Sequence, residues 1–212
     1  MDKKTQLSFI HRFIPSNKSE ARTPTVILFH GTGGNEEDLI PVGQQIAPEA
    51  AILSPRGKVL ENGMSRFFRR LAEGVFDMDD LKFRTHELAD FVEEASKVYG
   101  FSHNVIAIGY SNGANIAASV LLLRPAILTS AILFRPMLPL VPEVLPDLST
   151  HHIFISAGLY DPIVPGQETR NLFNLLKKTG AADISINWQN SGHELHLEEI
   201  RKARDWLFHK LC

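Results

Sequence analysis

The chain has 212 residues, of which 44% are hydrophobic and 22% charged, with a formal net charge of −2 at pH 7. This length and composition predict a single α/β domain over residues 1–212, and so small a charge gives no reason to expect nucleic acid or an anionic membrane as a partner. The one cysteine, Cys212, cannot form an internal disulfide, and a zinc–thiolate site would need more thiols.

The first residues, 1–6, are polar and lack the apolar core of a signal peptide. The most apolar region, 119–144, is interrupted by Arg124, Pro125 and Arg135, so it does not predict a membrane span. We therefore expect a cytoplasmic protein.

The first quarter of the chain alternates strand and helix patterns. Residues 7–14 alternate loosely and predict an antiparallel edge strand, whereas 25–30 form a continuous apolar run typical of a buried strand. Asn35 is the expected N-cap of a helix, with the acidic residues 36–38 in its first turn, and 50–54 form a third strand.

Residues 58–78 predict a long irregular loop, and loops of this length are often functional. Its arginines and phenylalanines are candidates for a pocket wall: Arg66, Phe67, Phe68, Arg69 and Arg70. The sequence supports another interpretation equally well, in which the arginines pair with the aspartates at positions 77, 79 and 80 and the aromatic rings pack beneath the loop.

A long helix is expected from an N-cap at Asp79 to Tyr99, because apolar residues recur at helical spacing and Gly100 follows. Residues 105–110 then form a buried strand and 114–123 a helix of small and apolar residues.

Between that strand and helix lies Gly109-Tyr110-Ser111-Asn112-Gly113. A bare Gly-x-Ser-x-Gly arises by chance in roughly one chain in fifteen of this length. The evidence for a nucleophile therefore depends on the strand before the motif and the helix after it. A serine at such a junction sits on a sharp turn that exposes its hydroxyl at the carboxyl edge of the sheet. We interpret Ser111 as a nucleophile and the backbone N–H of Asn112 as an oxyanion donor.

The remaining chain continues the alternation, with expected strands at 130–134, 152–157 and 184–188, helices at 167–178 and 194–211, and a proline-rich loop at 135–147. This pattern predicts an α/β fold: a mostly parallel, twisted sheet of about seven or eight strands with helices on both faces.

Ligands of such sheets lie at the carboxyl ends of the strands, where Thr32, Ser111, Asp161 and His193 follow four expected strands. A serine hydroxyl needs a base within hydrogen-bond reach and an orienting carboxylate, and the chain order Ser–Asp–His is that of α/β-hydrolases. We therefore expect Ser111, His193 and Asp161 to form a catalytic triad.

Rival side chains fall at the wrong ends of strands. Asp147 and Asp183 precede or begin a strand, and His151 and His152 also precede one. His193 and His196 have the wrong spacing for a His-Glu-x-x-His zinc motif, so no metal site is expected.

Gly31-Thr32-Gly33-Gly34 fits an oxyanion loop better than a dinucleotide-binding loop, because Glu36 stands where the third glycine of that pattern would be. Thr32 N–H is the expected donor, and Gly31 a neighbour of the substrate. Met137, in the proline-rich loop, either lines the pocket or covers the sheet. The apolar residues near Phe67 and Met137 leave a homodimer surface open as well.

Four motifs in order, at 30–34, 109–113, 158–165 and 191–194, resemble the phospholipase/carboxylesterase family, which also contains acyl-protein thioesterases and lies near the dienelactone hydrolases. The resemblance runs from about residue 25 to the end of the chain. It implies an α/β-hydrolase fold, the triad above, carboxylic-ester hydrolysis and no metal or organic cofactor.

The chain departs from that family at Tyr110 and Asn112, where Phe and Gln are common, and at Thr32, where Leu or Phe is common. Residues 54–57 together with 66–68 look like a bacterial carboxylesterase subgroup.

The sequence thus predicts a carboxylesterase-type serine hydrolase acting on small to medium acyl esters. A thioesterase or a lactone hydrolase would use the same triad, and a non-catalytic small-molecule binder is the alternative from another class.

Overall fold

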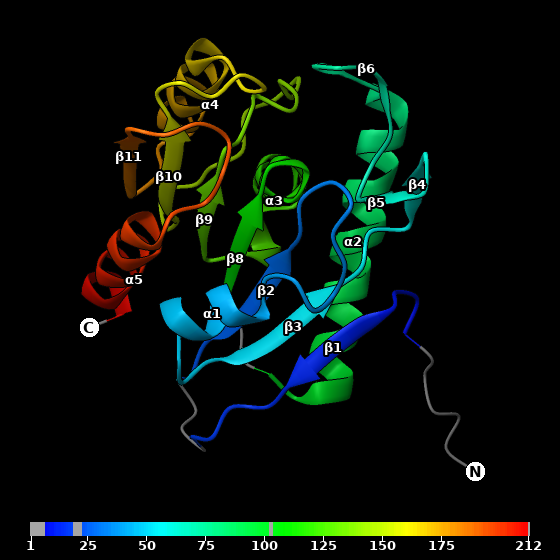
Figure 1. Ribbon diagram of the computed structural model, residues 1–212. Helices are drawn as coiled ribbons and strands as arrows, with labels where there is room; N and C mark the ends of the chain where they lie inside the picture. Colours follow the sequence, from blue (N-terminus) through cyan, green and yellow to red (C-terminus); the bar gives the residue numbers. More distant parts are fainter. Residues whose placement is uncertain (1–6, 19–22, 102–103, 212) are drawn as a thin grey trace.

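The computed structural model describes residues 7–18, 23–101 and 104–211, so Cys212 lies outside the described residues. A central sheet of seven strands runs in the order β1-β3-β2-β8-β9-β10-β11 (Figure 1). Its strands are β1 His11–Ile14, β2 Thr25–Phe29, β3 Ala51–Pro55, β8 Val105–Tyr110, β9 Ser130–Phe134, β10 His152–Gly158 and β11 Asp183–Gln189. Only β1 is antiparallel to its neighbour, which confirms the expected mostly parallel sheet with an antiparallel edge.

Helices cover both faces of the sheet (Figure 1). They are α1 Ile40–Ile46, α2 Met78–Tyr99, α3 Asn112–Leu123, α4 Gly166–Lys178 and α5 Leu197–Leu211, with a 3₁₀ helix, η1, at Pro125–Ile127. Alternate residues of β2 show the two layers. Ile27 belongs to the core cluster that includes residues of α2, α3 and α4, and Val26 belongs to the cluster that includes residues of α1 and α5. Right-handed crossovers explain this division, because the chain steps one way across the sheet through α1 and the other way through α2, α3 and α4.

The change of direction also fixes where a ligand would bind. From β2 the chain leads to β3 on one side and later to β8 on the other, so β2 and β8 are adjacent strands whose connections diverge. Such a switch point leaves a crevice at the carboxyl ends of the two strands. Thr32 follows β2 and Ser111 follows β8, so both lie beside that crevice.

Three expected boundaries were wrong. Asn35 caps a turn rather than a helix, and its Oδ1 accepts a hydrogen bond from Glu37 N–H at 2.8 Å. Helix α1 begins only at Ile40. Pro41 lacks an N–H and is tolerated only in the first turn of a helix, so the helix cannot begin much earlier. The N-cap of α2 is Asp77, whose side chain accepts from Asp80 N–H. The last helix begins at Leu197 rather than at residue 194.

The segment expected as an irregular loop forms two small antiparallel hairpins instead. β4 Val59–Glu61 pairs with β5 Met64–Arg66, and β6 Arg70–Ala72 pairs with β7 Val75–Phe76. The first hairpin turns at Asn62 and Gly63, which both have positive φ angles of 52° and 79°. Asn-Gly favours this conformation, so the turn is encoded locally. Within the described residues, no helix is both long and apolar enough to cross a bilayer.

Candidate active site

Ser111 occupies a strained turn between β8 and α3, with φ 54° and ψ −115°. The turn presses strand and helix together: a Cβ on Gly109 would lie 2.6 Å from Gly113 O, and one on Gly113 would lie 1.9 Å from Phe29 O. Both distances are too short for any side chain, which explains the two glycines. A non-glycine residue in this backbone region costs about 1–3 kcal/mol and persists only where the surroundings enforce it.

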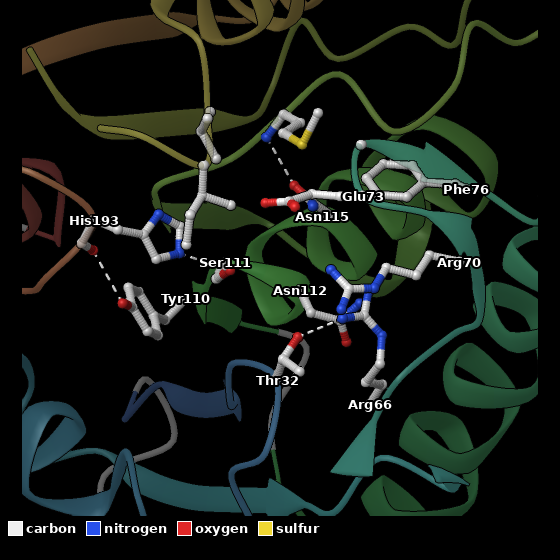
Figure 2. Close-up of a pocket in the computed structure, with 14 residues that line it drawn as sticks. Thr32, Arg66, Arg70, Glu73, Phe76, Tyr110, Ser111, Asn112, Asn115 and His193 are labelled. Atoms are coloured by element: carbon white, nitrogen blue, oxygen red, sulfur yellow. Dashed lines mark hydrogen bonds between the residues drawn. The ribbon is translucent and has the colours of Figure 1, made fainter. Parts of the chain in front are cut away.

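Ser111, His193 and Asp161 lie in one hydrogen-bonded row (Figure 2 shows the Ser111 end). His193 Nε2 is 2.9 Å from Ser111 Oγ, and His193 Nδ1 is 2.7 Å from Asp161 Oδ2. The other oxygen of Asp161 accepts from the backbone N–H groups of Ile163 and Val164 at 2.8 and 2.9 Å, which fixes the plane of the carboxylate. Asp161 can therefore orient the imidazole so that Nε2 faces the serine.

The rival carboxylates and histidines lie elsewhere. Asp183 and His152 begin β11 and β10, at the amino ends of the parallel strands. Asp147 lies in the loop before β10, and His151 Nε2 is bonded to Pro125 O at 2.9 Å. These positions agree with the sequence-based expectation.

His30 fixes the peptide that carries the expected oxyanion donor. Its Nε2 accepts from Gly57 N–H at 2.9 Å, so Nδ1 carries the proton and donates to Gly31 O at 2.7 Å. In a trans peptide the C=O and the next N–H point in opposite directions. The bond from His30 to Gly31 O therefore turns Thr32 N–H away from His30. Burial lowers the pKa of His30, which keeps the ring neutral in this arrangement.

Asn112 is the first residue of α3, where backbone N–H groups have no intrahelical acceptor. Thr32 and Asn112 both line the cavity that contains Ser111. The two expected oxyanion donors thus lie on the same cavity as the serine.

Tyr110 holds the backbone of His193. Its hydroxyl donates to His193 O at 3.0 Å, and the two rings are 5.4 Å apart (Figure 2). Burial raises the pKa of Tyr110, so the phenol remains a donor.

Arg135 clamps the loop that carries His193. It directly follows β9 with φ 56°, and its guanidinium donates to Gly192 O at 3.0 Å and to Glu194 O, the carbonyls on either side of His193. The histidine is thus held through its neighbours on both sides.

Glu199, from α5, neutralises Arg135 inside the protein. The two side chains are fully buried and share two hydrogen bonds, of 2.6 and 2.8 Å. Glu199 also accepts from Ser156 Oγ and His196 N–H, at 2.6 and 2.7 Å. Strand β10, the histidine loop and α5 are therefore tied to one buried ion pair.

The cavity has a volume of about 370 Å³ and is lined by triad, oxyanion and wall residues, including Thr32, Arg66, Ser111, Met137 and His193 (Figure 2). The other two expected pocket residues lie outside its lining. Phe67 is buried against Phe29 and His30, with ring centroids 5.5 and 4.7 Å apart. Gly31 lies behind Tyr110, where a Cβ would be 2.8 Å from the tyrosine ring.

The arginines of the hairpin segment divide between the two sequence-based alternatives. Arg69 pairs with Asp77 at 2.9 Å and lies outside the cavity lining. Arg66 and Arg70 line the cavity, and both contact Glu61.

Sequence reasoning missed Arg135 and Glu199 altogether. The other site residues were found because they directly follow expected strands. Arg135 also directly follows a buried strand, so the same position could have identified it. In the described part of the chain, no three His, Cys, Asp or Glu side chains cluster as metal ligands would.

Known proteins are similar to this chain over most of its length. A family model described as Phospholipase/Carboxylesterase matches residues 11–210. MhqD of Bacillus subtilis (strain 168) is 50% identical over 182 residues, which cover 85% of this chain and 90% of that protein.

Two solved structures are similar along almost their whole length. The Bacillus cereus carboxylesterase has a TM-score of 0.92 and 46% identity, covering 97% of this chain and 95% of its own. YahD, solved with malic acid, has a TM-score of 0.88 and 32% identity, covering 95% of this chain and 98% of its own.

Proposed function

Because the chain belongs to the phospholipase/carboxylesterase family, we propose that it is a serine hydrolase that cleaves carboxylic esters through an acyl-enzyme on Ser111. The observation that carries the proposal is the row of hydrogen bonds from Ser111 Oγ through His193 to Asp161, which opens into a cavity. A nucleophile, its base and the residue that orients the base are the parts that acyl transfer requires.

The reaction takes two steps. In the first, His193 Nε2 removes the proton of Ser111 as Oγ attacks the ester carbonyl, and the proton passes to the leaving alcohol as the C–O bond breaks. In the second, His193 activates a water molecule, which releases the acid and returns the proton to Ser111. The Thr32 and Asn112 N–H groups stabilise the oxyanion in both steps.

The size of the cavity supports small to medium acyl groups. Ligand pockets commonly span about 300–1,000 Å³, and this one lies near the lower limit at about 370 Å³. Malic acid, the ligand named for YahD, is a molecule that such a cavity would accommodate.

The test is hydrolysis of p-nitrophenyl esters of increasing acyl length by the wild-type protein and two variants. We expect Ser111→Ala to lower turnover by up to about 10⁶ and Asp161→Asn by about 10⁴. The optimum among short acyl chains would report the size of the pocket. Activity in Ser111→Ala close to that of the wild type would overturn the mechanism.

Thioesters and lactones would pass through the same acyl-enzyme, so the panel should include one of each. A lactone differs only in that its alcohol stays attached to the acyl group. The relative kcat/KM values identify the preferred bond.

A further inference from the structure

The wall of the cavity that faces His193 carries two arginines. Arg66 ends β5 and Arg70 begins β6, and both side chains lie across Ser111 from His193 (Figure 2). The Arg66 side chain is only 4% exposed, so its charge is largely removed from bulk water. A cavity of this kind is an expensive place for two cations unless something compensates them.

The described residues leave several donors of these arginines unpaired. Each guanidinium has five N–H donors. Arg66 donates from Nε to Phe68 O at 3.2 Å and from Nη1 to Thr32 Oγ1 at 2.6 Å, and its Nε lies 3.1 Å from Glu61. Arg70 donates from Nε to the other oxygen of Glu61 at 2.7 Å. Within the described residues, Arg66 Nη2 and both Nη atoms of Arg70 have no hydrogen-bond acceptor.

Asn112, which also lines the cavity, carries a further donor left unpaired in the described part of the chain. Its Oδ1 accepts from Phe67 N–H at 2.7 Å, which identifies Nδ2 as the other atom of the amide. That Nδ2 is buried and has no partner among the described residues. A buried donor left unpaired is destabilising, so this wall favours an acceptor.

A carboxylate fits this set of donors. The planar fork of a guanidinium binds a carboxylate through two parallel hydrogen bonds, and such charge-assisted bonds are strong when partly buried. One acidic side chain, Glu73, also lines the cavity. It lies on the exposed turn between β6 and β7 and would weaken, without blocking, the attraction for an anion.

The position of the arginines identifies the part of the substrate that they would contact. His193 must deliver a proton to the leaving oxygen, so the leaving group lies on the His193 side of Ser111. The acyl chain then extends the other way, toward Arg66 and Arg70 (Figure 2).

We propose that Arg66 and Arg70 bind a carboxylate on the acyl part of the substrate, so that half-esters of short dicarboxylic acids are preferred to neutral esters of the same shape. This rests on the proposed hydrolase function and names its substrate class. Hydrolysis would release a dicarboxylic acid and an alcohol.

The kinetic test compares monoethyl succinate with ethyl 4-methylpentanoate, in which an isopropyl group replaces the carboxylate. We expect the wild-type protein to favour the half-ester, and Arg70→Gln to lower the ratio of the two kcat/KM values about 10- to 100-fold, the range of a hydrogen bond to a charged group. Arg70→Gln should lower kcat/KM much more for the half-ester than for the neutral ester. Glu73→Gln should raise the ratio of kcat/KM for the half-ester to kcat/KM for the neutral ester, because it removes a negative charge from the cavity.

Arg69→Gln is the matched control, since it removes the same charge from the adjacent residue, whose side chain pairs with Asp77. In Arg69→Gln, the ratio of kcat/KM for the half-ester to kcat/KM for the neutral ester should equal that of the wild type. No preference for the half-ester in the wild type, or equal losses on both esters in Arg70→Gln, would overturn the proposal.

Calorimetric titration with glutarate separates this proposal from the proposed function, because binding needs no turnover. In the Ser111→Ala background we expect glutarate to bind and Arg70→Gln to weaken it about tenfold or more, while Arg69→Gln leaves it unchanged. A protein that hydrolyses neutral esters but does not bind glutarate would refute the subsite alone. Glutarate binding by a protein that hydrolyses no ester would refute only the hydrolase.

Discussion

Arg135 is buried behind the His193 loop, whereas Arg66 and Arg70 line the cavity, and the hydrogen-bond donors of the two sets of arginines have different partners. All three guanidinium nitrogens of Arg135 donate to protein acceptors, and the side chain and its partner Glu199 are fully buried. Arg66 and Arg70 share one glutamate and keep donors that face the cavity. The difference shows how to separate arginines that hold a fold together from arginines available to a ligand.

The same difference predicts opposite responses to mutation. A buried, saturated arginine should be needed for stability and should act on chemistry only through the loop that it holds. A cavity arginine with spare donors should be needed for substrate selection and matter little for stability. Of the three predictions below, the first and the last test this contrast, and the second tests the buried histidine that holds the Gly31 peptide.

Arg135→Met should lower the free energy of unfolding by about 3–5 kcal/mol, because it leaves the Glu199 carboxylate buried without its cation. Urea unfolding followed by circular dichroism measures the change. Adding Glu199→Met should restore part of the loss, since an apolar pair removes the unpaired charge. If the double variant were no more stable than Arg135→Met, the loss would not come from the orphaned charge.

The pH dependence of stability should contain a contribution from His30, which is buried directly after β2. Burial lowers the pKa of His30 in the folded protein below its ordinary value of 6.5, so the unfolded chain binds the proton more readily. This contribution is fully present above pH 6.5 and is lost as the pH falls from 6.5 to the folded pKa, with a slope of at most about 1.4 kcal/mol per pH unit.

His30→Gln should flatten that part of the curve of unfolding free energy against pH. Urea unfolding at several pH values from 7.5 downward compares the variant with the wild type. Parallel curves would mean that the histidine is not held neutral by its bonds to Gly31 and Gly57.

Arg70→Gln should change the free energy of unfolding by less than about 1 kcal/mol, because its ion pair with Glu61 is partly exposed, at 29% and 25%. The measurement is the same urea unfolding used for Arg135→Met. A loss as large as that of Arg135→Met would contradict the distinction between the buried arginine and the cavity arginines.

The strands of the sheet and the row of site residues were accessible from the sequence. Runs such as residues 25–29 and 105–110 are continuously apolar because both of their faces are covered, and the catalytic candidates were found as polar residues directly after such runs. The hairpins at 59–76 were missed, although Asn62-Gly63 is a strong hairpin signal, because their strands are only two or three residues long and mostly exposed.

The role of Arg135 depends on packing that no local pattern contains. Its acceptors come from β10, the loop at 191–194 and α5, all more than 20 positions away along the chain. The division of Arg66, Arg69 and Arg70 between cavity and surface likewise depends on how the hairpins fold against α2. Local spacing could raise these residues as candidates, but only the tertiary structure separates them.

The most direct test of the account is covalent labelling with a fluorophosphonate, followed by peptide mapping. The account predicts one equivalent of label on Ser111 in the wild-type protein, slower labelling in His193→Ala, and none in Ser111→Ala. Label on another residue, or undiminished labelling of Ser111→Ala, would contradict it. An unlabelled wild-type protein would favour a binding protein on the same fold.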